Sequence, residues 1–121
     1  MPIQKILVVD DSATERFALL EFLTKHGYQV VTAESGEEAI TKSKAEKPDL
    51  ILMDVVMPGM NGYQATRTIS REAATSAIPI IMCTSKGLET DKIWGMRQGA
   101  YDYLVKPVSL PDLLARIRAI G

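Results

Sequence analysis

Three carboxylates directly follow two apolar runs of strand length. Residues 6–9 (ILVV) precede Asp10 and Asp11, and residues 50–53 (LILM) precede Asp54. Continuous apolar runs are typical of strands buried on both faces. A carboxylate at the end of such a strand costs free energy unless something pairs with it. Ligands bind at the carboxyl ends of strands in open parallel sheets, so these acids lie where a site is expected.

A hydroxyl and an ammonium follow two further apolar runs. Thr84 comes after residues 80–83, and Lys106 comes after residues 101–105. The intervals along the chain leave room for one helical return between successive strands, so all four strand ends can share one edge of a sheet. The sequence therefore predicts that three acids, a hydroxyl and a lysine lie together.

Crowded carboxylates raise one another's pKa values unless a cation lies among them, and oxygen ligands of this kind suit Mg²⁺. One carboxylate would then be free to act as a nucleophile toward a phosphoryl group. Asp54 is the best candidate for this role. Lys106 would hold a phosphate oxygen, and the Thr84 hydroxyl could hydrogen-bond another.

The remaining sequence predicts five strands alternating with five helices, which gives right-handed βαβ crossovers and an α/β sandwich of three layers. Ser12 with Glu15, Ser35 with Glu38 and Asn61 with Gln64 form possible capping boxes at three helix starts. The first helix would end near His26, the second before Pro48 and the third near Glu72. A fourth strand opens after Pro79, a helix spans about 91–98, and Ser109 caps the last helix. The side chains expected to face the core from these helices are Phe17, Leu20, Leu23, Ala39, Ile40, Leu113, Leu114, Ile117 and Ile120.

The 121 residues are expected to form one domain, 1–121. Fourteen basic and fifteen acidic residues give a net charge of −1, which argues against a nucleic-acid partner. The N-terminus reaches two acids after four apolar residues, so we expect no signal peptide and no membrane association. The only cysteine, Cys83, is expected to be a buried hydrophobe, as suits a cytoplasmic protein.

Four segments of the chain carry a resemblance to a known family: VVDD (8–11), LMDVVMPGMNG (52–62), CTS (83–85) and YLVKP (103–107). They resemble the receiver domain of bacterial two-component response regulators, including the chemotaxis regulator. The match covers the whole chain in order and spacing, and it implies the strand order 2-1-3-4-5 of a flavodoxin-like, doubly wound five-stranded sheet. Within the family, residues 75–79 and 89–107 look most similar to single-domain regulators of type IV pilus twitching motility.

The resemblance implies that Asp54 accepts a phosphoryl group from a histidine kinase or a histidine phosphotransfer protein. It also implies Mg²⁺ ligation by Asp11, Asp54 and the Val56 carbonyl, with Asp10 acting largely through water. Thr84 would move toward the phosphate and Tyr103 would turn inward, changing the surface of the fourth helix, fifth strand and fifth helix. That surface would control a downstream motility protein, and the chain would act as a monomer or weak dimer. A cis peptide before Pro107 is expected as well.

Three alternatives to a phosphoryl-accepting switch remain: a phosphatase, a cofactor-binding protein, and a receiver that only drains phosphate from the same pathway. A phosphatase working through an aspartyl phosphate needs a general acid near its nucleophile, and Val55 and Val56 supply none. A flavodoxin-like cofactor binder needs a phosphate loop after the first strand, where this chain has acids. A phosphate sink in the same pathway is the third. Trp94 is a candidate partner contact if its neighbour Ile93 faces the core, although partial burial of Trp94 is an equal alternative.

Overall fold

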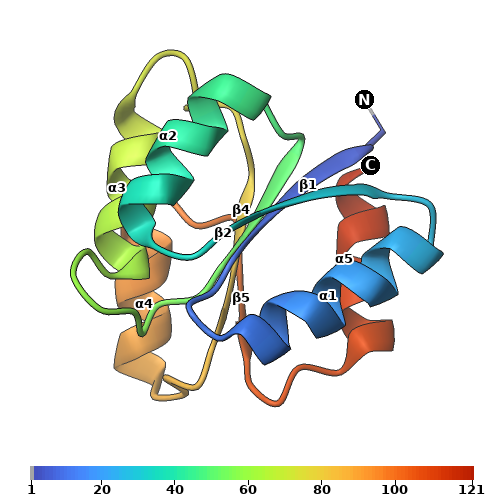
Figure 1. The fold of residues 1–121 in the computed structure, drawn as a ribbon. Helices are drawn as coiled ribbons and strands as arrows, with labels where there is room; N and C mark the ends of the chain where they lie inside the picture. Colours follow the sequence, from blue (N-terminus) through green and yellow to red (C-terminus); the bar gives the residue numbers. More distant parts are fainter. Residues whose placement is uncertain (1) are drawn as a thin grey trace.

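The computed structural model describes residues 2–121, which form a five-stranded parallel sheet in the order β2-β1-β3-β4-β5 (Figure 1). This confirms the predicted fold class and strand order. Every connection between strands contains a helix, as parallel neighbours require. The strands are β1 (Lys5–Val9), β2 (Gln29–Ala33), β3 (Leu50–Met53), β4 (Ile80–Thr84) and β5 (Asp102–Val105); the helices are α1 (Ala13–Lys25), α2 (Gly36–Glu46), α3 (Gly62–Arg71), α4 (Glu89–Arg97) and α5 (Leu110–Ile120).

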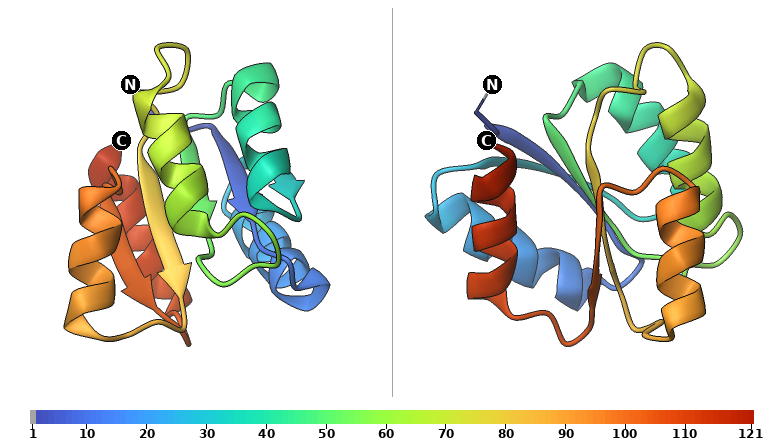
Figure 2. Two further views of the ribbon diagram at one scale, coloured as in Figure 1. Left: turned by 90° about the vertical axis from the view of Figure 1, so that its left-hand side faces the viewer. Right: turned by 180° about the vertical axis from the view of Figure 1, so that it is seen from behind.

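Helices α1 and α5 cover one face of the sheet, and α2, α3 and α4 cover the other (Figures 1 and 2). The alternating side chains of the strands fill a core on each face. Leu52 of β3 packs with Leu23 of α1 and Leu113 of α5, while Ile51 packs with Ala39 of α2 and Ile69 of α3. All four residues of β3 are buried, because both faces of this central strand are covered. The strand that carries Asp54 is therefore held from both sides.

The helix starts agree with the predicted caps, but two of the three capping boxes are wrong. Ser12 and Ser35 each accept a hydrogen bond from the backbone N–H three residues on. In a complete box the Glu15 and Glu38 carboxylates would accept from the N–H groups of Ser12 and Ser35. Instead, the Ser12 N–H donates to Asp10, and the Glu38 carboxylate accepts from the Glu34 N–H. Only Asn61 and Gln64 form the complete box. Glu15 is therefore free to point elsewhere.

Phe17 was expected to face the core, and this prediction is wrong, since the residue is 59% exposed. Leu23 of the same helix is fully buried, and Leu19 and Phe22 pack partly beside it. Phe17 precedes Leu23 by six residues, which places the two side chains roughly 120° apart around the helix. The other predicted inward positions are buried or half-buried.

Helix α4 begins two residues earlier than predicted, at Glu89. The Asp91 carboxylate accepts a hydrogen bond from the Leu88 N–H at 3.2 Å and so caps the helix from within its first turn. Within residues 2–121 we find no helix with both the length and the apolar character that crossing a bilayer requires.

Candidate functional site

The sheet brings the predicted strand-end groups to one edge. Asp10 follows β1, Asp54 follows β3, Thr84 ends β4 and Lys106 follows β5, and these four strands are consecutive neighbours. Backbone hydrogen bonds fix the turns: the Asp54 N–H donates to the Val9 carbonyl at 3.0 Å, and the Lys106 N–H donates to Thr84 at 2.8 Å. The functional side chains thus sit on the rigid ends of buried strands.

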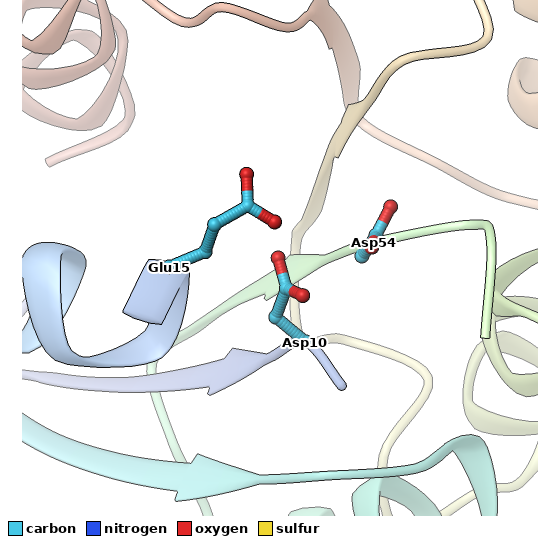
Figure 3. Close-up of side chains that lie close together, drawn as sticks. All are labelled: Asp10, Glu15 and Asp54. Atoms are coloured by element: carbon cyan, nitrogen blue, oxygen red, sulfur yellow. The ribbon is translucent and has the colours of Figure 1, made fainter. Parts of the chain in front are cut away.

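Three carboxylates meet at this edge, but they are not the three that the sequence predicted. One oxygen from each of Asp10, Glu15 and Asp54 lies within 4.8 Å of the others (Figure 3). Glu15 reaches in from the first turn of α1 and replaces Asp11, which is exposed and lies outside the group. The pattern Ser12-x-x-Glu15 indicated a helix cap, and that interpretation obscured the role of Glu15. Its short distance from Asp10 along the chain is the signal that could have revealed it.

Lys106 bridges all three carboxylates. Its Nζ donates to Glu15 Oε2 at 2.7 Å and to Asp10 Oδ2 at 3.0 Å, and it lies 3.5 Å from Asp54 Oδ2. Burial alone would lower the pKa of Lys106. The hydrogen bonds to Glu15 and Asp10 and the charge of Asp54 outweigh this effect and raise the pKa above its ordinary value. The lysine is therefore a fixed cation among three acids.

Asp54 is 6% exposed, and its two carboxylate oxygens have different partners. Oδ1 accepts hydrogen bonds from the backbone N–H groups of Val55, at 2.7 Å, and Val56, at 3.4 Å. Oδ2 faces Lys106. Burial, followed by the charge of Asp10, raises the pKa of Asp54 despite the opposing effects of Lys106 and the two N–H groups. The folded protein therefore favours the protonated form of Asp54 more than an unfolded chain does.

The donor set fits a hard divalent cation. Three carboxylates face a single ammonium, so the group carries an excess of negative charge and offers only oxygen ligands, which Mg²⁺ prefers. Val56 is 52% exposed in the loop after Asp54, and the described contacts place its N–H against the carboxylate. The acid group can therefore hold a cation through Asp10 and Asp54, with Glu15 alongside.

The side chains behind the acids are buried. Thr84 is fully buried, and its Oγ1 accepts a hydrogen bond from the Lys86 N–H at 3.3 Å. Tyr103 is 3% exposed and already points inward, where its hydroxyl donates to the Lys86 carbonyl at 2.7 Å. Cys83 is buried as predicted, and burial raises the pKa of its thiol to about 12, which leaves the thiol unreactive.

Trp94 is 49% exposed on α4, as a partner contact requires. The premise that Ile93 faces the core is wrong, because Ile93 is 47% exposed. Gly95 is the buried residue within Glu89–Arg97, so α4 approaches the sheet through a glycine and presents its larger apolar side chains outward. Tyr101 and Val105, beside and within β5, are exposed as well.

The parallel fold, the strand-end acids and the lysine agree with the arrangement that the resemblance implied, and the Lys106–Pro107 peptide is cis as expected. The chain belongs to the response regulator receiver domain family, whose pattern matches residues 6–118, and it is thus a receiver domain of a two-component system. The resemblance predicted from the motifs is confirmed.

Among individual proteins, the chain is 55% identical to protein PilH of Pseudomonas aeruginosa over 96% of both chains. It is 46% identical to the probable transcriptional regulator ycf27 of Pyropia yezoensis, but covers only 47% of that protein. Chemotaxis protein CheY4 of Vibrio cholerae superposes with a TM-score of 0.91 at 33% identity, covering 98% of this chain and 99% of that one. A CheX-CheY-BeF3-Mg complex from Borrelia burgdorferi gives 0.90 at 28% identity, covering 97% and 88%.

Proposed function

We propose that this receiver domain is a phosphoryl-accepting switch and that Asp54 is the acceptor. The observation that carries the proposal is the setting of Asp54, a buried carboxylate at the end of the central strand with its Oδ2 3.5 Å from the Lys106 ammonium. The donor would be a phosphohistidine on a histidine kinase or phosphotransfer protein. Asp54 Oδ2 would form a bond to phosphorus while the phosphorus–nitrogen bond breaks and its electron pair stays on the imidazole.

The chain's own groups support each part of that transfer. Lys106 would neutralise charge that arrives on the phosphoryl oxygens, and the Thr84 hydroxyl would donate to one of them after leaving the Lys86 N–H. The two N–H groups on Asp54 Oδ1 orient the carboxylate so that Oδ2 faces the pocket. Rigid positioning and charge neutralisation are what phosphoryl transfer requires of a protein.

Mg²⁺ is the cation we propose for the acid group. Asp54, Asp11 and the Val56 carbonyl would hold it, with Asp10 acting largely through water and Asp11 joining from outside the acid group, and it would supply positive charge among the carboxylates. The structure of the CheY from Borrelia burgdorferi contains both Mg and BeF3, which supports the same pairing of a cation and a phosphoryl mimic here.

We infer that the output is binding to another protein and that the domain is not an enzyme. The exposed apolar side chains of α4 and β5 offer a surface for such a partner, and aromatic residues are frequent in the centres of interfaces. Similarity to PilH supports a motility partner in type IV pilus twitching or a chemotaxis-like pathway, and we expect the protein in the cytoplasm. The loop after Asp54 carries Val55 and Val56, which provide no general acid for steady phosphatase turnover.

The experiment is to treat the protein with a small phosphodonor and Mg²⁺ and to follow its intact mass. One phosphoryl group should add to the wild-type chain and none to Asp54→Asn. Asp112→Asn is the matched control, because that acid lies in the first turn of α5, outside the acid group, and should label normally. Full labelling of Asp54→Asn would refute the assignment.

A further inference from the structure

Five buried residues form a small cluster of their own beneath α4, apart from the cores on the two faces of the sheet. The cluster joins the loop after Asp54 to the fourth and fifth strands. Its members are Val55, Tyr63, Met82, Ala100 and Tyr103. Side chains from both the acceptor loop and the strand beside α4 therefore share one packing unit.

Tyr63 occupies a particular place in this cluster, because it lies in the first turn of α3, directly after Gly62, which packs against the backbone of the acceptor. The Gly62 N–H donates to the Val55 carbonyl at 3.0 Å, and a Cβ on Gly62 would collide with the Asp54 carbonyl oxygen. The first turn of α3 thus lies in contact with the backbone of Asp54 and Val55. Any displacement there is transmitted to the Tyr63 ring, since packed interiors deform little.

The Tyr63 hydroxyl reaches across to α4 and to Tyr103. It lies 3.1 Å from the Asp91 carbonyl oxygen in the first turn of α4 and 3.2 Å from the Tyr103 hydroxyl. Tyr103 in turn donates to the Lys86 carbonyl at 2.7 Å. The hydroxyls of Tyr63 and Tyr103 have two hydrogens for these three contacts. The Tyr103 hydrogen takes part in the shortest contact, with the Lys86 carbonyl. The Tyr63 hydrogen is consequently shared between Asp91 and Tyr103.

Helix α4 meets this cluster through Gly95. Gly95 is its buried residue, and a Cβ there would lie 2.8 Å from Met82 Sδ and 2.9 Å from the Tyr103 ring. The helix therefore rests directly on Tyr103. Whatever fixes the Tyr103 ring also fixes the surface against which α4 packs.

We propose that Tyr63 is a positioning residue that holds Tyr103 inward and couples the acceptor loop to α4. This inference rests on the proposed switch, and it adds a second connection to α4 beside the one through Thr84, so that the response of α4 requires both. The contacts run from Asp54 through Gly62 to Tyr63, and from the Tyr63 hydroxyl to Tyr103 and α4. Tyr103 is accordingly set inward before any phosphoryl group arrives.

The test measures the solvent accessibility of Tyr103 directly, by hydroxyl-radical footprinting with peptide mapping. Tyr63→Phe keeps the ring and removes the hydroxyl, so Tyr103 should be oxidised about fivefold faster, the factor carried by one net hydrogen bond. Tyr28→Phe is the matched control, because Tyr28 packs on the opposite face of the sheet and should leave Tyr103 protected. An unchanged rate in a folded Tyr63→Phe protein would overturn the proposal.

A second arm separates this proposal from the proposed function. With beryllium fluoride and Mg²⁺ bound, Tyr103 of Tyr63→Phe should stay more exposed than Tyr103 of the wild-type protein, because the hydroxyl that connects the acceptor loop to the ring is missing. Equal protection of Tyr103 in the two proteins, each shown by calorimetry to bind the mimic, would refute the coupling to the acceptor loop. If the wild-type protein does not bind the mimic, the proposed function fails, and the first arm still decides whether Tyr63 holds Tyr103.

Discussion

The acid pocket and the outer surface of α4 contrast in almost every physical respect. The acid pocket (Asp10, Glu15, Asp54 and Lys106) has its two aspartates at the ends of buried strands, and Lys106 lies within 3.5 Å of an oxygen of each acid. The outer surface of α4 carries Ile93, Trp94 and Met96, each more than two-fifths exposed. One region is polar and held rigidly, whereas the other is apolar and joined to the sheet through Gly95.

The contrast suits two separate tasks, with phosphoryl transfer at the acid pocket and partner binding at the outer surface of α4. Phosphoryl transfer depends on groups that stay in place, and strand ends between two helical layers provide them. A switch needs an element that can settle into a second arrangement at low cost, and a helix with one buried glycine meets that need. Variants in the two regions should therefore fail in different ways.

The largest effect is expected from Lys106→Ala. Three carboxylates would lose their shared cation, and the metal-free protein should become less stable by about 2–4 kcal/mol, since part of the lysine side chain remains solvated. Mg²⁺ binding should persist, because the carboxylates remain, but the response of α4 to a phosphate mimic should disappear. Thermal unfolding, calorimetry and partner binding test these three statements. Normal partner binding by the phosphorylated variant would contradict the role given to Lys106.

Asp10→Asn and Asp11→Asn should separate cation binding from crowding. Both substitutions remove a proposed oxygen ligand and should weaken Mg²⁺ binding by at least about tenfold. Only Asp10 lies in the acid pocket, so only Asp10→Asn should lower the pKa of Asp54. Calorimetry and a carbon NMR titration of the Asp54 carboxyl give the two readouts. An equal pKa change in both variants would show that Asp11 also belongs to the pocket.

Glu15→Gln should have a smaller effect, and unlike the preceding variants it should increase a function, namely the rate at which Asp54 is labelled. The glutamate holds Lys106 at 2.7 Å and is 46% exposed in its side chain, so the interaction is a modest one. Its loss should release Lys106 toward an incoming phosphoryl group and speed the labelling of Asp54 by up to about fivefold. Glu46→Gln is the matched control, since Glu46 forms an ion pair of similar exposure with Lys5, at the start of β1 and outside the pocket. Slower labelling of Glu15→Gln would show that Glu15 assists the reaction.

The smallest effect concerns stability as a function of pH. The pKa of Asp54 is raised in the folded protein, so folding favours its protonated form and this group lowers stability as pH rises above its unfolded value of 3.8. Asp54→Asn removes that penalty. Its melting temperature, measured without metal, should exceed that of the wild type by roughly 3–6 °C near neutral pH. The difference should shrink toward about pH 4 and when Mg²⁺ binds the wild-type protein.

The sequence predicted the framework of the site but not its complete composition. Apolar runs placed Asp10, Asp54 and Lys106 at strand ends, because a buried strand leaves few alternatives for its register and direction. Glu15 escaped prediction because a long side chain in a first helical turn can cap its own helix or turn toward a neighbouring charge. The choice depends on Lys106, which lies 91 residues away along the chain.

The orientation of helical side chains was predicted less well. Phe17 was expected to face the core, and the interpretation of Trp94 was conditional on Ile93 facing the core, yet both side chains are exposed. In α1 and α4 the side chains of the sheet that face each helical turn decide which helical positions are buried. The spacing of apolar residues along the helix does not specify those side chains. At α4 the deciding feature is the Tyr103 ring, which admits a glycine and excludes anything larger.

The most direct test of the account is the fluorescence of Trp94 during successive additions of Mg²⁺ and a phosphate mimic. Trp94 is the only tryptophan, it lies on the outer surface of α4, and it is separate from the acid pocket. We predict that Mg²⁺ alone leaves the emission nearly unchanged, that beryllium fluoride then shifts it, and that Thr84→Ala abolishes the shift. A strong change with Mg²⁺ alone, or no response to the mimic once it is bound, would contradict the proposed separation between a fixed chemical site and a movable helix.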